Sequence, residues 1–261
     1  MVDAARGPGA AADTRSLALP GGDSLTVAAF GGQVLSWRAA GRERLYLSPL
    51  ARLGGPGAVR GGVPVCFPQF HTRGPGPRHG FARQRVWAWD DSACAADRLA
   101  LTLRDEPETR RHGPGAFDAR LLVSLRPGAL DMSLSVHNRG AEPLSFTGAL
   151  HTYLAVDDVA AVRLDGLHEP LAGPVGLDRV YARAPAGLIL HDGVQRLHIE
   201  QSAGWAHTVV WNPGAVGARA LDDLPDADFA RMLCVEAAQV FSPIAVAPGT
   251  AWTGTQTLTL L

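Results

Sequence analysis

Apolar side chains recur at every second position through much of this chain, and this pattern restricts its fold more than any other feature. Leu121, Val123 and Leu125 share one such register, and Pro127-Gly128 then provides a turn signal. The register resumes after the turn, with Leu130, Met132, Leu134 and Val136 alternating with Ser133, Ser135 and His137. Successive side chains of a β-strand point to opposite faces, so the pattern predicts two half-buried strands joined in a hairpin.

The same alternation returns at the C-terminus, where Trp252, Gln256, Leu258 and Leu260 alternate with four threonines. Further strands are expected at 24–29, 33–38, 99–104, 144–156, 196–201, 208–212 and 232–237. Amphipathic helices are not indicated, apart from one turn at 226–232 that Asp226 would cap. Many short strands with Gly/Pro turns predict an all-β fold, a large two-layer antiparallel β-sandwich. We expect a single domain over 16–261, preceded by a disordered tail at 1–15.

Composition excludes several classes of function. The formal net charge is −1, which gives no global field for nucleic acid or an anionic membrane. All 24 basic residues are arginine, so lysine Schiff-base chemistry and the P-loop lysine are excluded. Three widely spaced cysteines predict neither a disulfide framework nor a zinc site. Without a signal peptide or membrane span in the sequence, we expect a soluble cytoplasmic protein.

The segment from Arg60 to Trp87 has no helical or strand period and is rich in arginine, glycine and proline. Arg60, Arg78 and Arg83 are suited to hold a phosphate or carboxylate, because a guanidinium donates two parallel hydrogen bonds. A long irregular segment inside a domain often carries function, although an ordinary connector is the alternative.

Two further residues could carry chemistry. His151 lies in a strand-like apolar run, where a histidine is either a satisfied core residue or a group that moves a proton near neutral pH. Glu236 is the one charged residue of an apolar strand, and it either pairs with an arginine or lines a site. The acidic run Asp222, Asp223, Asp226 and Asp228 is most simply a solvated loop.

Taken together, these motifs resemble the glucose-6-phosphate 1-epimerases of the aldose 1-epimerase superfamily. The resemblance extends from the GGQVLSW motif at 31–37 to the C-terminus. It includes RGGVPVCFPQF at 60–70, HGFAR at 79–83, ALHTY at 149–153, DRVY at 178–181, VVWNPG at 209–214 and CVE at 234–236. The family fold is a large two-layer antiparallel β-sandwich, in agreement with the strand pattern.

The resemblance implies that His151 and Glu236 are the catalytic pair. It implies sugar-phosphate binding by Arg60 and Arg83, substrate binding by Asp178, and a place for His79 in the same pocket. Relatives commonly have glutamine where this chain has Arg78. We count Arg78 among the candidate substrate-binding residues, and expect its charge to tighten phosphate binding or to change which sugar phosphate is preferred.

The implied reaction interconverts α and β anomers by opening the sugar ring, with Glu236 as base and His151 as acid. It needs no metal and no organic cofactor. The expected partner is a small sugar phosphate, with no nucleic acid and no membrane, and the expected assembly is a monomer. Two alternatives stay open: a non-catalytic sugar-phosphate sensor, and an epimerase for unphosphorylated aldoses.

Overall fold

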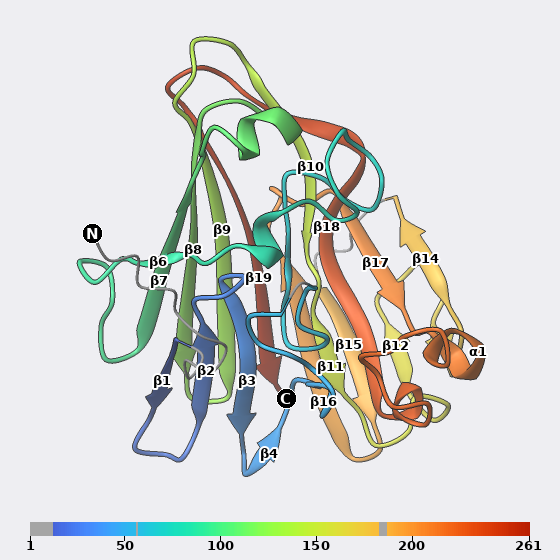
Figure 1. Cartoon of the computed structure of the whole chain (residues 1–261). Coiled ribbons are helices and arrows are strands. Elements are labelled where there is room, and N and C mark those ends of the chain that lie inside the picture. Colours follow the sequence, from blue (N-terminus) through green and yellow to red (C-terminus); the bar gives the residue numbers. More distant parts are fainter. Residues whose placement is uncertain (1–12, 56, 183–186) are drawn as a thin grey trace.

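The computed structural model describes residues 13–55, 57–182 and 187–261, and shows an antiparallel β-sandwich (Figure 1). The largest sheet has nine strands. Their order is β13 (Leu171–Ala172), β12 (Arg163–Asp165), β15 (Gly187–Asp192), β16 (Gln195–Gln201), β19 (Ala251–Leu260), β9 (Ala129–Asn138), β8 (Phe117–Arg126), β7 (Arg98–Arg104) and β6 (Ala88–Trp89).

A six-stranded sheet carries most of the functional motifs. Its order is β14 (Asp178–Tyr181), β17 (His207–Trp211), β18 (Met232–Val246), β10 (Leu144–Leu150) and β5 (Val65–Cys66), and β11 (Tyr153–Ala155) also pairs with β18. A four-stranded sheet contains β1 (Thr14–Ala18), β2 (Ser24–Ala28), β3 (Gln33–Ala39) and β4 (Arg42–Glu43). Helical structure in the described residues is confined to α1 (Gly214–Ala218) and the 3₁₀ turns η1 (Ala82–Gln84), η2 (Thr109–His112) and η3 (Asp228–Arg231).

The predicted hairpin is confirmed as β8 and β9, with Leu121 opposite Leu134 and Leu125 opposite Leu130. One hydrophobic core joins these strands to the other two sheets, because Leu121, Leu150 and Trp37 belong to the same cluster and are each almost fully buried. Burial of a large apolar side chain contributes about 1.5–3 kcal/mol, so this shared core holds the sheets together.

Some boundaries differ from the prediction. The expected strand at 144–156 is two strands, β10 and β11, separated by His151 and Thr152. The turn near 226–232 forms as η3, but its N-cap is Ala227 and no side chain caps it, so the prediction for Asp226 was wrong. Strand β1 already begins at Thr14, within the segment expected to be a tail, whose residues 1–12 lie outside the described residues.

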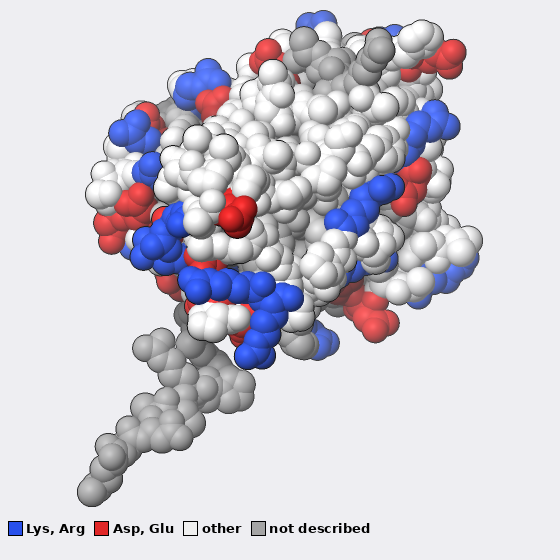
Figure 2. All heavy atoms as spheres, turned by 90° about the horizontal axis from the view of Figure 1, so that it is seen from above, with Lys and Arg blue, Asp and Glu red and all other residues white. Residues whose placement is uncertain are grey.

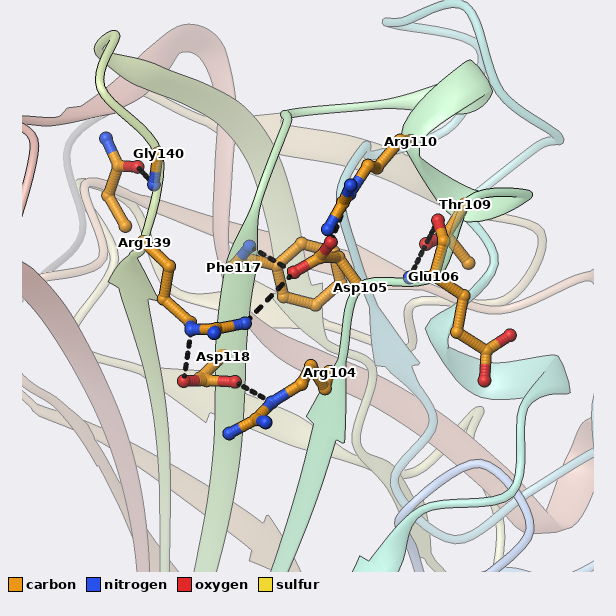
Figure 3. Close-up of polar contacts among 10 residues, drawn as sticks. Arg104, Asp105, Glu106, Thr109, Arg110, Phe117, Asp118, Arg139 and Gly140 are labelled. Carbon is orange, nitrogen blue, oxygen red and sulfur yellow. Dashed lines mark hydrogen bonds and ion pairs between the residues drawn. The ribbon is translucent and has the colours of Figure 1, made fainter.

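Ion pairs connect the ends of β7, β8 and β9 to each other and to η2 (Figure 3). The buried Asp105 carboxylate accepts a hydrogen bond from the Phe117 amide at 2.9 Å and pairs with Arg110 and Arg139. Arg139 also contacts Asp118 at 3.2 Å. A buried carboxylate is costly unless partnered, so these contacts fix the 105–116 connection over the end of the core. On the face in Figure 2, arginine and acidic side chains are interspersed.

Candidate active site

His151 and Glu236 lie opposite one another on neighbouring strand segments. Leu150 pairs with Ala237, and Tyr153 pairs with Cys234. His151 therefore lies opposite Glu236, next to the Leu150–Ala237 pair. Directly opposite residues project from the same face of a sheet. The two side chains therefore meet, with His151 Nδ1 and the Glu236 carboxylate oxygen Oε1 3.4 Å apart.

The break between β10 and β11 is held from several sides. The His151 amide donates to the Pro64 carbonyl at 3.0 Å, which ties it to the loop before β5. On the core side, Thr152 Oγ1 donates to Gln256 Oε1 at 2.5 Å, and Gln256 Nε2 donates to the Val235 carbonyl at 3.0 Å. Gln256 of the opposite sheet thus links the neighbours of both candidate catalytic residues.

Burial dominates the electrostatics of the pair, since His151 is 8% exposed and Glu236 is 1% exposed. Burial raises the pKa of Glu236 well above its usual value, with a further contribution from Asp178 and opposition from Arg83. Burial lowers the pKa of His151 well below its usual value, as do His79, Arg83 and Arg60. In the ligand-free pocket both shifts favour the neutral forms, so the carboxyl of Glu236 is favoured over the imidazole of His151 as the holder of a proton.

Aromatic rings fix the orientation of His151. Tyr153 stacks on it with ring centroids 4.7 Å apart and an interplanar angle of 11°, and Trp211 approaches edge-on at 6.0 Å. His79 lies 5.7 Å away, and its Nδ1 is within 3.4 Å of the His71 amide. Burial, reinforced by Arg83 and Arg78, lowers the pKa of His79 to about 3. His79 is therefore a neutral imidazole near pH 7.

The three arginines of the pocket differ in exposure and in their hydrogen-bond partners. Arg83, in η1, donates from Nη2 to the Arg78 carbonyl at 2.9 Å, while its buried Nε has no partner. Arg78 is exposed at the pocket. Arg60 donates from Nε to Asp223 and from Nη1 to Tyr153 Oη, both at 3.0 Å.

Sequence reasoning missed the buried side chain that holds the backbone around Arg60. Gln33 Nε2 donates to the Gly61 carbonyl at 2.6 Å and approaches the Val59 carbonyl at 3.2 Å. Gln33 is fully buried, so these bonds clamp the residues on both sides of Arg60 to β3. The GGQVLSW motif contained this signal, because a glutamine in an apolar strand needs polar partners.

All seven predicted site residues line one open pocket of about 200 Å³. They are Arg60, Arg78, His79, Arg83, His151, Asp178 and Glu236. Asp178 arrives there because β14 pairs with β17, opposite Trp211. Sequence reasoning assigned no role to five other lining residues: Phe70, His71, Val209, Trp211 and Leu221. Trp211 and Val209 stood within the VVWNPG motif, whereas Leu221 carried no signal.

The acidic run at 222–228 is not simply a solvated loop. Asp222 and Asp226 are exposed, as expected, but Asp223 pairs with Arg60, and Asp228 accepts a hydrogen bond from Tyr46 Oη at 2.6 Å. The prediction was wrong for these two residues because their partners lie more than 160 positions away in the sequence.

Gly80 places His79 and η1, and it offers a test of the loop geometry. Its φ is +72°, and an added Cβ would lie 2.1 Å from the Phe67 carbonyl oxygen. We expect Gly80→Ala to lower stability by about 3 kcal/mol or more, because backbone strain and a clash combine. Gly41→Ala is the matched control, since Gly41 has φ +74° but nothing within 4 Å. Thermal melting of both variants measures the difference, and equal losses would contradict the clash.

The fold is that of a mutarotase-type β-sandwich, and comparisons with known proteins agree. The sequence model of the aldose 1-epimerase family matches residues 15–171 and 167–259. A curated protein of Cenchrus ciliaris named "Putative glucose-6-phosphate 1-epimerase" is 35% identical over 255 residues, covering 86% of this chain and 78% of that protein. A protein of the same name from Escherichia coli K12 is 33% identical over 237 residues, covering 80% and 77%.

The crystal structure of a "putative mutarotase" from Salmonella typhimurium has a TM-score of 0.82 at 26% identity, covering 91% of this chain and 87% of that one. The chain belongs to the aldose 1-epimerase family. Membership implies that the ligand is a small sugar. In the part of the chain that the structure describes, no group of three or more His, Cys, Asp or Glu side chains is placed to hold a metal ion. Across the same residues, no helix is both long and apolar enough to cross a membrane.

Proposed function

We propose that this protein interconverts the α and β anomers of glucose 6-phosphate and related hexose 6-phosphates. One observation carries the proposal. Three buried polar atoms without a hydrogen-bond partner, Arg83 Nε, His151 Nδ1 and Glu236 Oε2, belong to residues that line the same pocket. Buried polar atoms normally have partners, so their concentration here indicates a polar ligand that supplies them. The names of the curated relatives support the choice of glucose 6-phosphate.

Mutarotation requires a base for the anomeric hydroxyl and an acid for the ring oxygen. We assign Glu236 as the base and His151 as the acid. Transfer of the carboxyl proton from Glu236 to His151, whose Nδ1 lies 3.4 Å from Glu236 Oε1, gives a carboxylate base and an imidazolium acid. The pair as a whole neither gains nor loses a proton. Arg83 favours the carboxylate form of Glu236, and an anionic ligand favours protonated His151.

Ring opening then follows with balanced proton transfers. Glu236 takes the proton from the anomeric hydroxyl while His151 protonates the ring oxygen, and the C1–O5 bond breaks to give the aldehyde. Rotation about C1–C2 presents the other carbonyl face, and the reverse transfers close the ring. The pair returns to its starting protonation, so the cycle consumes no co-reactant.

The arginines supply the case for a phosphorylated sugar. Arg60, Arg78 and Arg83 line one small pocket, and guanidinium groups bind phosphate oxygens in a directed way. A neutral aldose needs no such concentration of fixed positive charge. Arg78, at the exposed side, adds a charge where relatives of this type commonly have glutamine, and we assign it to the phosphate together with Arg60 and Arg83. Asp178 and His79 are assigned to sugar hydroxyls.

Anomer exchange measured by NMR tests the proposal directly. Purified protein should accelerate α–β exchange of glucose 6-phosphate far above the spontaneous rate and act much more weakly on glucose, because only the phosphate engages the arginines. Exchange of neither sugar would remove the enzymatic assignment and favour a binding-only protein. Faster exchange of glucose than of glucose 6-phosphate would instead show an epimerase for unphosphorylated aldoses.

A further inference from the structure

A chain of contacts connects an exposed loop to the candidate acid. Asp223 accepts a hydrogen bond from Arg60 Nε at 3.0 Å, and Arg60 Nη1 donates to Tyr153 Oη at 3.0 Å. The Tyr153 ring is nearly parallel to that of His151, with centroids 4.7 Å apart. Each link is a direct contact, and the chain runs from partly exposed Asp223 to buried His151.

The loop that carries Asp223 is attached at its backbone as well. The Asp223 carbonyl accepts a hydrogen bond from Ser48 Oγ at 2.6 Å, and the Ser48 amide donates to the Arg60 carbonyl at 3.0 Å. Ser48 therefore joins the two partners a second time, through their main chains. Leu221, two residues before Asp223, lines the pocket. The position of Asp223 is consequently fixed relative to both Arg60 and the pocket wall.

These contacts restrict what the Arg60 guanidinium can do. Two of its three nitrogens are engaged by Asp223 and Tyr153, which sets the plane of the group and leaves the Nη2 edge for a ligand. Burial works against its charge, but Tyr153 and Asp223 raise the pKa of Arg60 above its usual value. An arginine fixed in this way loses little conformational freedom when it binds an anion.

We propose that Asp223 is a positioning residue that acts through Arg60 on both the ligand and the Tyr153–His151 stack. The predicted effect on catalysis rests on the proposed function, whereas the predicted effect on the surroundings of His151 does not. Asp223 does not line the pocket and touches no reacting atom, so its effect depends entirely on Arg60.

Epistasis in enzyme assays tests this dependence. Asp223→Ala should lower kcat/KM for glucose 6-phosphate about tenfold, because small displacements of positioning groups are costly. In an Arg60→Ala background the same change should have less than about a twofold effect, since non-additivity marks residues that act together. Asp223→Asn keeps an acceptor for Arg60 Nε and should retain most activity. Asp222→Ala is the matched control, because Asp222 is an exposed neighbour, and should behave as wild type.

Additive losses in the double variant would overturn the proposal, as would wild-type kinetics for Asp223→Ala. If Asp223→Asn were as impaired as Asp223→Ala, charge compensation rather than positioning would be the role, and the proposal would also fail. Thermal melting shows whether any loss instead follows general destabilisation.

A substrate-free measurement separates this inference from the proposed function. The side-chain ¹⁵N resonances of His151, assigned by their loss in His151→Asn, should shift in ligand-free Asp223→Ala and stay unchanged in Asp222→Ala. A shift in a protein that exchanges no sugar would retain the positioning role and reject the epimerase. Unchanged resonances in an active enzyme would reject the positioning role alone.

Discussion

Glu236→Gln is expected to reduce anomer exchange by about 10²–10⁴-fold, because the amide has nearly the same shape but cannot accept the hydroxyl proton. Binding of the sugar phosphate should change little, since Arg60, Arg78 and Arg83 remain in place. NMR exchange rates and calorimetric titration measure the two effects separately. Glu142→Gln, at an exposed position, is the matched control. A rate near that of wild type would show that another group is the base.

The same substitution should stabilise the protein, and the sign follows from linkage. The folded-state pKa of Glu236 is raised above its usual value of 4.5, so the folded protein binds more protons than the unfolded chain above that pH. The pH-dependent contribution of Glu236 to the free energy of unfolding is complete below about pH 4.5 and is lost as the pH rises through the raised pKa. Glutamine does not titrate, so the stability advantage of Glu236→Gln should grow with pH over this range.

Thermal melting between pH 5 and pH 9 measures this advantage. For a chain of this length, a gain of about 1 kcal/mol corresponds to roughly 2–4 °C in Tm. Glu142→Gln should follow wild type at every pH. A melting temperature for Glu236→Gln that falls relative to wild type as the pH rises would contradict the raised pKa.

His151→Asn is expected to have an activity loss of similar size, about 10²–10⁴-fold, because asparagine cannot deliver a proton to the ring oxygen. Substrate affinity should again be largely retained. His168→Asn, at an exposed histidine, is the control and should leave exchange unchanged. Retained turnover in His151→Asn would show that another group is the acid.

The pH dependence of the wild type follows from the same residue. Burial and the neighbouring cations lower the pKa of His151 below 6.5, so a second proton enters the pair only below that pH. The acid limb of kcat/KM, which reports the free enzyme, should therefore lie below pH 6.5 once the titration of the substrate phosphate near pH 6 has been subtracted. Stability from the neutral imidazole is present above pH 6.5 and is lost as the pH falls, so His151→Asn should gain relative to wild type under acidic conditions.

An acid limb centred above pH 6.5 would contradict the lowered pKa of His151. A melting temperature for His151→Asn that falls relative to wild type as the pH is lowered would contradict it as well.

Much of the fold could be predicted because strand alternation is local. The β8–β9 hairpin and β19 follow directly from side chains at every second position. The same rule failed at His151, because a two-residue interruption between β10 and β11 depends on the Pro64 carbonyl and on Gln256 of the other sheet. These partners are distant in sequence, so no local pattern contains them.

The sequence by itself determined the strand-rich fold, the family resemblance and the identity of the residues that gather at the pocket. Only the tertiary structure decided which of these residues lie next to each other and how deeply each is buried. Strand register places His151 opposite Glu236, and packing removes both from water, which alters their pKa values. Asp223 shows the same limit, since its carboxylate acquires a role only when folding brings Arg60 within 3.0 Å. Residue type and periodicity are local properties, whereas distance, burial and partner choice arise when remote segments meet.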